Sequence, residues 1–270
     1  LLTGLEGRKF RIGILLVALC CPGLRALAQD ESEPRRPDYI FSDSEAFFVD
    51  ELERRALLYF QEQTDDVSGL TYDRASTKGG QSHAPASIAA TGFALTAWCV
   101  ADHRHWLVSN EARRRVTKTL KFILANVPNE RGWIYHFVDA RTGARMWECE
   151  ASTIDTALLL HGAIAAREYL QDPEVTRLVN QLYARIDWNW ALDGGTTLSH
   201  GWRPENGFVP HRWDSFAEML GMYLLGLGAP GSHPLPPATW RAWQRGPIVT
   251  YAGRTLFQCP PLFPHQYTQA

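Results

Sequence analysis

Three segments of the chain show the spacing of apolar residues that is typical of amphipathic α-helices. They are residues 45–63, 111–126 and 173–187, and Ser42 or Asp43 is suited to cap the first of them. In that first segment one stripe is formed by Phe47, Phe48, Leu52, Ala56, Leu57 and Phe60. Such helices are expected to bury one face and to expose the other to water.

Three further segments, residues 87–101, 153–170 and 215–227, are apolar on nearly all sides and predict buried helices. They alternate along the chain with the amphipathic segments. This alternation is expected of an all-α toroid, in which helical hairpins form an inner and an outer layer. An α-solenoid would alternate similarly, usually with a clearer sequence repeat. Residues 237–244 predict a further short helix, and residues 248–257 predict a β-hairpin in the loops.

The loops that lead into the three apolar segments resemble one another in composition. Each is long and carries glycine, aromatic and acidic residues, whereas the opposite connections, HRHWLVSN and QDPE, are short. Long, decorated loops at one end of a helical bundle and tight turns at the other place the functional residues at one mouth of the predicted toroid.

The second of these loops, RGWIYHFVDARTGARMWECEAS, crowds aromatic residues and carboxylates before an apolar helix. Aromatic rings stack on the apolar faces of sugars, and carboxylates supply the acid and base of glycoside hydrolysis. Glu150 stands among hydrophobic neighbours without a cationic helix partner, so we expect a raised pKa and a role as general acid. Asp155, in the first helical turn, is suited equally to helix capping and to catalysis. Candidate stacking platforms are Tyr72, Trp133, Trp147, Trp202 and Trp213.

The third loop, SHGWRPENGFVPHRWD, and the helix predicted after it hold three further acids. Glu205 is suited to catalysis or to the surface turn in which it lies. Asp214 is suited to catalysis or to capping the next helix. Glu218, inside an otherwise apolar helix, is costly to bury unless it binds substrate or pairs with Arg203 or Arg212.

In the first loop, Asp73 is suited to contact a sugar hydroxyl or to pair with the adjacent Arg74, itself a candidate for substrate binding. Histidines fall in all three loops, at His83, His136, His200 and His211. Their spacing does not fit a metal site, so we expect no metal and no other cofactor. Hydrogen bonding to sugar hydroxyls is the use expected of His136 and His200.

The N-terminal sequence indicates export, and the net charge argues against nucleic-acid binding. The 270 residues carry a formal net charge of -2, which provides no basic surface. Residues 1–28 have the basic start, short apolar run and small-residue cleavage site of an export signal, and that run is too short to span a membrane. Residues 29–42 predict a disordered leader. Residues 43–270 are expected to form one domain, monomeric and either periplasmic or extracellular.

Several ordered motifs, among them SIAATGFAL, ECEASTIDTALLL, SHGWRPENGFVPHRWDSFAE and PLFPHQY, resemble the glycoamylase-like domain family, which includes bacterial endo-β-1,2-glucanases. The resemblance extends from Phe47 to the last residue. It implies an (α/α)6 barrel and a glycoside hydrolase that acts on β-glucan by inversion. By this resemblance Glu150 matches the glutamate of the family's E-x-STIDTAL motif, and the catalytic acids lie among Asp73, Glu150 and the acids of the third loop.

Family members continue beyond the HQY motif, and only about seven helices are predicted here, so the barrel is expected to be incomplete at its C-terminal end. We predict that Glu150 donates a proton to the glycosidic oxygen. A second acid would activate water, either Asp155, Glu205, Asp214 or a residue outside this chain. The alternatives are a polysaccharide lyase on the same toroid, a non-catalytic glycan-binding domain and an inactive fragment.

Overall fold

The structure, a computed structural model, describes residues 42–79 and 84–267. The predicted export signal, nearly all of the predicted leader and His83 lie outside these residues. The described helices are α1 (Asp43–Glu62), α2 (Ile88–His103), α3 (Glu111–Asn126), α4 (Thr153–Leu170), α5 (Pro173–Ala184), α6 (Leu220–Leu227), α7 (Thr239–Ala242) and α8 (Leu262–Tyr267). The strands are β1 (Ala86–Ser87), β2 (Asn129–Glu130), β3 (Trp133–Ile134), β4 (Phe137–Val138), β5 (Ala151–Ser152), β6 (Gly201–Arg203), β7 (Gly207–Phe208), β8 (Ile248–Tyr251) and β9 (Arg254–Phe257).

The first four helices begin and end within two residues of the bounds that the pattern of apolar residues predicts. Later elements differ more. α5 ends at Ala184 instead of residue 187, and α6 begins at Leu220 instead of residue 215. The start of α6 is displaced because the Phe216 N–H donates to the Gln244 carbonyl at 2.8 Å, which holds this segment extended. α8 and the short strands β1 to β7 were not predicted, whereas the β8–β9 hairpin was.

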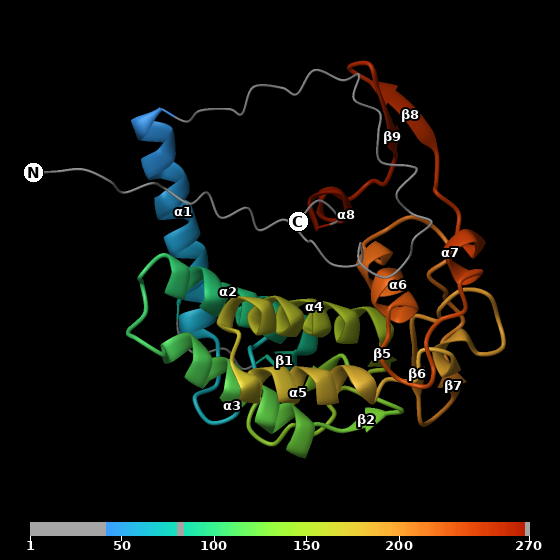
Figure 1. The fold of residues 1–270 in the computed structure, drawn as a ribbon, viewed down its shortest axis with the longest axis horizontal. Helices are drawn as coiled ribbons and strands as arrows, with labels where there is room; N and C mark the ends of the chain where they lie inside the picture. Colours follow the sequence, from blue (N-terminus) through green and yellow to red (C-terminus); the bar gives the residue numbers. More distant parts are fainter. Residues whose placement is uncertain (1–41, 80–83, 268–270) are drawn as a thin grey trace, which may run out of the picture.

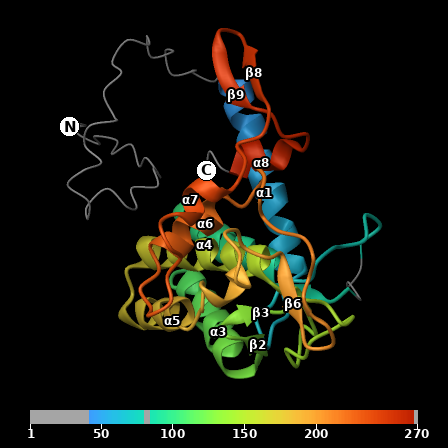
Figure 2. The same cartoon turned by 90° about the vertical axis from the view of Figure 1, so that its right-hand side faces the viewer.

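Helices α2 and α4 lie side by side at the centre of the fold, and α3 and α5 cover them on one side (Figures 1 and 2). α1 packs against α2, and α6 packs against α4. The two apolar helices therefore lie inside the two amphipathic ones, as their sequences predict. The mostly helical class is confirmed, and closure into a toroid stays a prediction.

The backbones of α2 and α4 touch where two glycines face each other. A Cβ atom added to Gly162 would clash with the carbonyl oxygen of Gly92 and lie 2.6 Å from its carbonyl carbon. A Cβ atom added to Gly92 would lie 2.6 Å from the Cα atom of Leu159. Only glycine permits this approach, which lets the large apolar side chains on either side of the contact pack closely.

The apolar stripe predicted for α1 is mostly exposed. Phe47, Phe48 and Leu52 are 73%, 66% and 56% exposed, and Leu57 alone is buried in this helix. The β8–β9 hairpin stands apart from the central helices (Figure 1). Among the described helices, none combines the length and hydropathy needed to cross a membrane.

Candidate active site

Short antiparallel strands join the three predicted loops edge to edge. β1, which leads into α2, pairs with β4 of the second loop. β5, which leads into α4, pairs with β6 of the third loop, and β6 pairs with β7. The structure therefore places the three loops together at the ends of the central helices.

The N-cap of α4 is Ser152, whose hydroxyl oxygen accepts the Asp155 N–H at 3.2 Å. The Asp155 side chain is thus not the cap, although it accepts a hydrogen bond from the same Ser152 hydroxyl. The start of α2 has the equivalent cap, since Ser87 accepts the Ala90 N–H at 3.2 Å. The second oxygen of Asp155 faces the second loop, where His136 lies.

A histidine connects the two predicted acids of the second loop. Nδ1 of His136 lies 3.3 Å from Oε1 of Glu150, and its Nε2 lies 3.6 Å from Oδ1 of Asp155. Arg203, on β6, donates from Nη2 to Oε2 of Glu150 at 3.1 Å. The imidazole stacks on the ring of Phe137, with centroids 3.8 Å apart. The second and third loops thus converge on one carboxylate.

The predicted rise in the pKa of Glu150 is wrong. The hydrogen bond from His136 lowers the pKa of this carboxyl to about 2, with a further contribution from Arg203, and burial opposes both. Sequence neighbours gave no sign of these cations because His136 lies 14 positions and Arg203 lies 53 positions away. Glu150 is therefore ionised at neutral pH in the free protein.

The other two groups of the cluster shift in the opposite sense to Glu150. Burial disfavours a charged His136, but the hydrogen bond to Glu150 and the charges of Asp155, Glu150 and Asp73 outweigh it and raise the pKa of His136. The pKa of Asp155 is raised by desolvation, against the opposing effects of His136 and Ser152. Because these groups interact strongly, their protons belong to the cluster as a whole.

Residues 210–270 match a family model described as "Glycoamylase: Putative glucoamylase". No curated protein matches the chain. The fold is similar to a solved structure of a Bacteroides fragilis "putative glucoamylase", with a TM-score of 0.71 and 24% identity over 86% of this chain and 61% of that one. It is also similar to an endo-β-1,2-glucanase from Chitinophaga pinensis in complex with sophorotriose and glucose, with a TM-score of 0.70 and 20% identity over 85% of this chain and 60% of that one.

The resemblance to the glycoamylase-like family is confirmed. A β-1,2-glucanase from Parabacteroides distasonis shares the fold as well, with a TM-score of 0.70 and 20% identity over 84% of this chain and 37% of that one. The TM-scores of 0.70 and 0.71 establish a shared fold. The chain spans about three fifths of the length of the first structures it matches, at 61%, 59% and 60%.

Two other predicted acids have cationic partners. Asp73 pairs with Arg74, whose Nε donates to Oδ2 at 2.6 Å. Glu205 forms a two-point ion pair with Arg145, at 2.5 and 3.0 Å, and is half exposed. Arg145 also lies over the ring of Tyr135, 4.8 Å from its centroid. Arg145 thus neutralises Glu205, a contact for which the sequence offers no local signal.

The acids near α6 lie outside regular structure. Asp214 is exposed and is not the cap of α6, because that helix begins only at Leu220. Glu218 lies in the turn before the helix instead of within it. Neither predicted arginine pairs with Glu218, because Arg203 binds Glu150 and Arg212 donates to carbonyl groups of the preceding loop.

The predicted aromatic platforms divide into buried and accessible rings. Trp133 is fully buried, packs edge-on against Trp188 and donates to the Asp187 carbonyl at 2.9 Å, so its predicted role in stacking on sugar is wrong. Trp147 is 61% exposed and lies edge-on to Phe137, whose ring also stacks on that of His136. Trp147 therefore offers a ring to a ligand next to the carboxylate cluster.

Three further predicted contacts are only partly exposed. Trp213 stacks on His200, with centroids 4.0 Å apart, and its indole donates to Thr153 at 3.0 Å. Trp202 neighbours Arg203 on β6, so strand alternation directs it to the opposite face of the sheet, where it packs against Trp190. Tyr72 is half-buried, and its carbonyl accepts the hydroxyl of Tyr59.

The backbone before Glu150 is in an unusual conformation. Trp147 and Glu148 have φ angles of 56° and 48°, which place two successive non-glycine residues in the left-handed region. Such residues cost about 1 to 3 kcal/mol each and persist where the surrounding structure fixes them. Here the turn presents the Trp147 ring to solvent while Glu150 points inward. Sequence patterns do not reveal this conformation.

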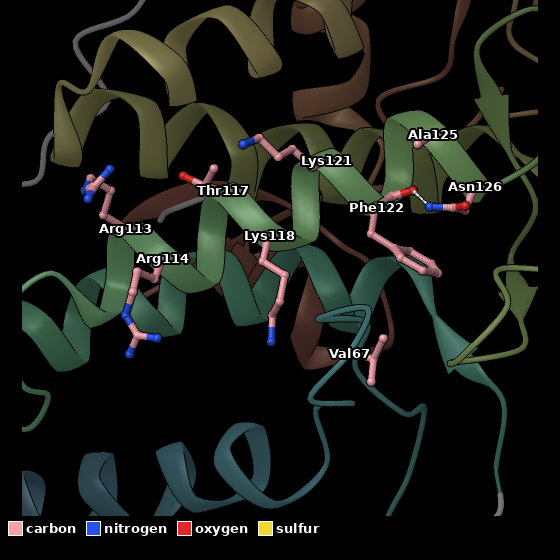
Figure 3. A pocket seen from close by; sticks show the side chains of 9 residues that line it. All are labelled: Val67, Arg113, Arg114, Thr117, Lys118, Lys121, Phe122, Ala125 and Asn126. Atoms are coloured by element: carbon pink, nitrogen blue, oxygen red, sulfur yellow. Dashed lines mark hydrogen bonds between the residues drawn. The ribbon is translucent and has the colours of Figure 1, made fainter.

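A pocket of about 570 Å³ lies away from these loops, on the outer face of α3 (Figure 3). It is lined by Val67, Arg113, Arg114, Thr117, Lys118, Lys121, Phe122, Ala125 and Asn126. Its lysines are already paired, since Lys121 contacts Glu174 at 2.6 Å and Lys118 donates to the Asp66 carbonyl at 2.6 Å. The pocket has no acidic lining residue, so the candidate site is the Glu150 cluster. Among the described residues, no group of three His, Cys, Asp or Glu side chains is arranged to hold a metal.

Proposed function

We propose that the chain is an exported glycoside hydrolase that acts on β-glucan, with β-1,2-glucan as the preferred substrate. Two of the structures that share its fold are named as β-1,2-glucanases. The observation that carries the proposal is the Glu150 carboxylate, held by His136 and Arg203 at the junction of the three loops. A carboxylate that is 21% exposed, near an exposed indole ring, can supply one of the two acids and a stacking surface for hydrolysis of a sugar polymer.

In this proposal Glu150 passes a proton to the glycosidic oxygen as the bond breaks, and Trp147 stacks on a neighbouring sugar ring. A second carboxylate takes a proton from the attacking water. Asp155 is only 6% exposed and is poorly placed to touch water in a cleft. Glu205 is neutralised by Arg145. Asp73 is likewise paired with Arg74, so Asp214, which is exposed, is the remaining candidate among the predicted acids that the structure describes.

The test compares Glu150→Gln with Glu148→Gln, an exposed acid two positions earlier. The protein encoded by the gene is incubated with β-1,2-, β-1,3- and α-1,4-glucans, and the released oligosaccharides are quantified. We expect hydrolysis of the β-1,2-glucan, a loss of about 100-fold or more in kcat for Glu150→Gln, and little change for Glu148→Gln. Wild-type turnover by Glu150→Gln would refute the assignment.

The same assay separates the competing functions. A polysaccharide lyase would release unsaturated sugars that absorb ultraviolet light, on uronate polymers and not on glucans. A non-catalytic glycan-binding domain would retain ligand without releasing products, and its affinity would not depend on Glu150. Either result would replace the hydrolase proposal.

A further inference from the structure

Both ring nitrogens of His136 face carboxylate oxygens, Nδ1 toward Glu150 and Nε2 toward Asp155. A neutral imidazole carries one N–H donor and one bare nitrogen, and a bare nitrogen repels a carboxylate. The imidazolium form alone presents an N–H to both acids, as a hydrogen-bond donor to Glu150 and as the cation of an ion pair with Asp155. The geometry therefore favours a proton stored on His136 between the two carboxylates.

Several parts of the fold place charged side chains near this ring. Glu150 precedes β5, Asp155 lies on α4, and Asp73 lies in the loop after α1. Arg203 is the nearby cation and binds the far oxygen of Glu150. Two carboxylates thus face the imidazole directly, and Asp73, itself paired with Arg74, adds a smaller attraction for its positive charge.

The main chain fixes the ring in this position. The His136 N–H donates to the Glu150 carbonyl at 2.9 Å, and the His136 carbonyl accepts the Ile88 N–H at 3.2 Å. The side chain remains 31% exposed, so it can exchange protons with solvent. On the far side, Asp155 is held by the Ser152 hydroxyl and orients Nε2.

We propose, on the basis of the proposed function, that His136 is a positioning residue that holds the Glu150 carboxylate and supplies it with a proton at each turnover. The Nδ1–H bond breaks as the Oε1–H bond of Glu150 forms, which leaves a neutral imidazole. Glu150 then gives this proton to the glycosidic oxygen, which keeps the electron pair of the broken C–O bond. The attacking water provides hydroxide to the sugar carbon and one proton to the second carboxylate, which releases it to solvent, and His136 regains a proton from solvent.

The first test is His136→Gln, which retains a hydrogen-bond donor but cannot relay a proton. We expect kcat to fall about 100-fold, with KM changed by less than about threefold. Without the imidazolium, the Glu150 carboxyl loses the main cause of its low pKa, so the remaining activity should be confined to acidic pH. A residue that only supports the fold would lower activity without moving the pH profile. Wild-type kcat and pH dependence in His136→Gln would overturn the proposal.

The matched control is His233→Gln, which alters an exposed histidine in the loop between α6 and α7. It should retain the wild-type kcat and pH profile. Unfolding curves of both variants show whether each is folded. If His136→Gln does not fold, Asp155→Asn takes its place, because it keeps the size of the side chain and removes the charge that faces Nε2. Asp155→Asn should then shift the alkaline limb of the pH profile to lower pH, and an unmoved limb would overturn the proposal.

A second measurement does not depend on catalysis. The His136 imidazole is titrated by nuclear magnetic resonance in the wild type and in Glu150→Gln. We expect its pKa to fall when Glu150 loses its charge. An unchanged pKa would overturn the proposal that Glu150 and His136 are bridged by a hydrogen bond. If the pKa falls but the wild type hydrolyses no glucan, the bridge between the side chains is established and the proposed function is refuted.

Discussion

The contact between Gly92 and Gly162 makes a strong prediction about stability. In Gly162→Ala the new methyl group would overlap the Gly92 carbonyl, which belongs to a helix backbone and cannot rotate away. Alanine improves helix propensity by about 1 kcal/mol. Overpacking of a tight core contact costs about 1 to 3 kcal/mol, and the upper end applies where backbone meets backbone. The net loss should therefore be about 2 kcal/mol.

The assay is thermal and urea unfolding followed by circular dichroism. A net loss of about 2 kcal/mol corresponds to a fall of about 4 to 8 °C in Tm for a domain of this size. Gly228→Ala is the matched control, since a Cβ atom there would lie 3.4 Å from its nearest neighbour, the Leu224 carbonyl oxygen. Its stability should change by less than about 0.5 kcal/mol.

Helix propensity and packing predict opposite signs, so the result is decisive. If Gly162→Ala is as stable as the wild type or more stable, the close contact of α2 and α4 is not real. Adding Gly92→Ala gives a further check. Once one methyl group has separated the helices, the second should cost less than it does alone, so the two losses should not add.

Three further predictions follow from individual residues. Trp133→Ala should lower the free energy of unfolding by about 3 to 5 kcal/mol, and an intact KM in the folded fraction would exclude sugar stacking. Burial lowers the pKa of His161 from 6.5, so the unfolded state binds the proton first and stability should decline as pH falls below about 6.5. His161→Gln should show a smaller difference in free energy of unfolding between pH 7.5 and 5.5, and an equal difference would contradict this cause. Glu205→Gln should keep kcat within about threefold of the wild type, because its carboxylate is paired with Arg145, whereas a loss as large as that of Glu150→Gln would make it a catalytic acid.

The central helices could be predicted because their signal is local. α3 and α4 begin and end where the apolar pattern does, since each buries a face defined by its own sequence. Elements whose ends depend on hydrogen bonds to distant residues could not be predicted in this way. The Asp187 N–H donates to the Arg131 carbonyl at 2.9 Å and draws the chain away from α5 before the predicted helix end. The bond between Phe216 and Gln244 delays α6 in the same way.

The meeting of the three loops could be predicted from the sequence, whereas the electrostatics of Glu150 could not. Glu150 stood out because a carboxylate next to aromatic residues at a helix start is uncommon. Its ionisation depends on His136 and Arg203, which meet it only after the strands pair. Trp133 shows the same limit, because composition alone does not separate a tryptophan that packs in the core from one that faces a ligand.

The starts of α2 and α4 share their backbone arrangement in detail. Thr91 and Thr156 each donate their hydroxyl to the carbonyl of the capping serine at 2.8 Å. Each also accepts an N–H from the preceding loop, Thr71 at 3.0 Å for Thr91 and Ile134 at 2.9 Å for Thr156. The same set of hydrogen bonds therefore attaches a loop to the start of each central helix.

The start of α4 carries two acids, and the equivalent positions at the start of α2 do not. The position of Glu150 before the strand is occupied at α2 by Pro85, and the position of Asp155 is occupied by Ala90. The Ala90 N–H reaches its capping serine at the same 3.2 Å, so the cap needs no carboxylate. Strand pairing and helix capping at α2 succeed without either acid, so the fold does not account for them at α4. Ionisable groups that the fold does not require, gathered with His136 in a partly buried cluster, are best explained by chemistry.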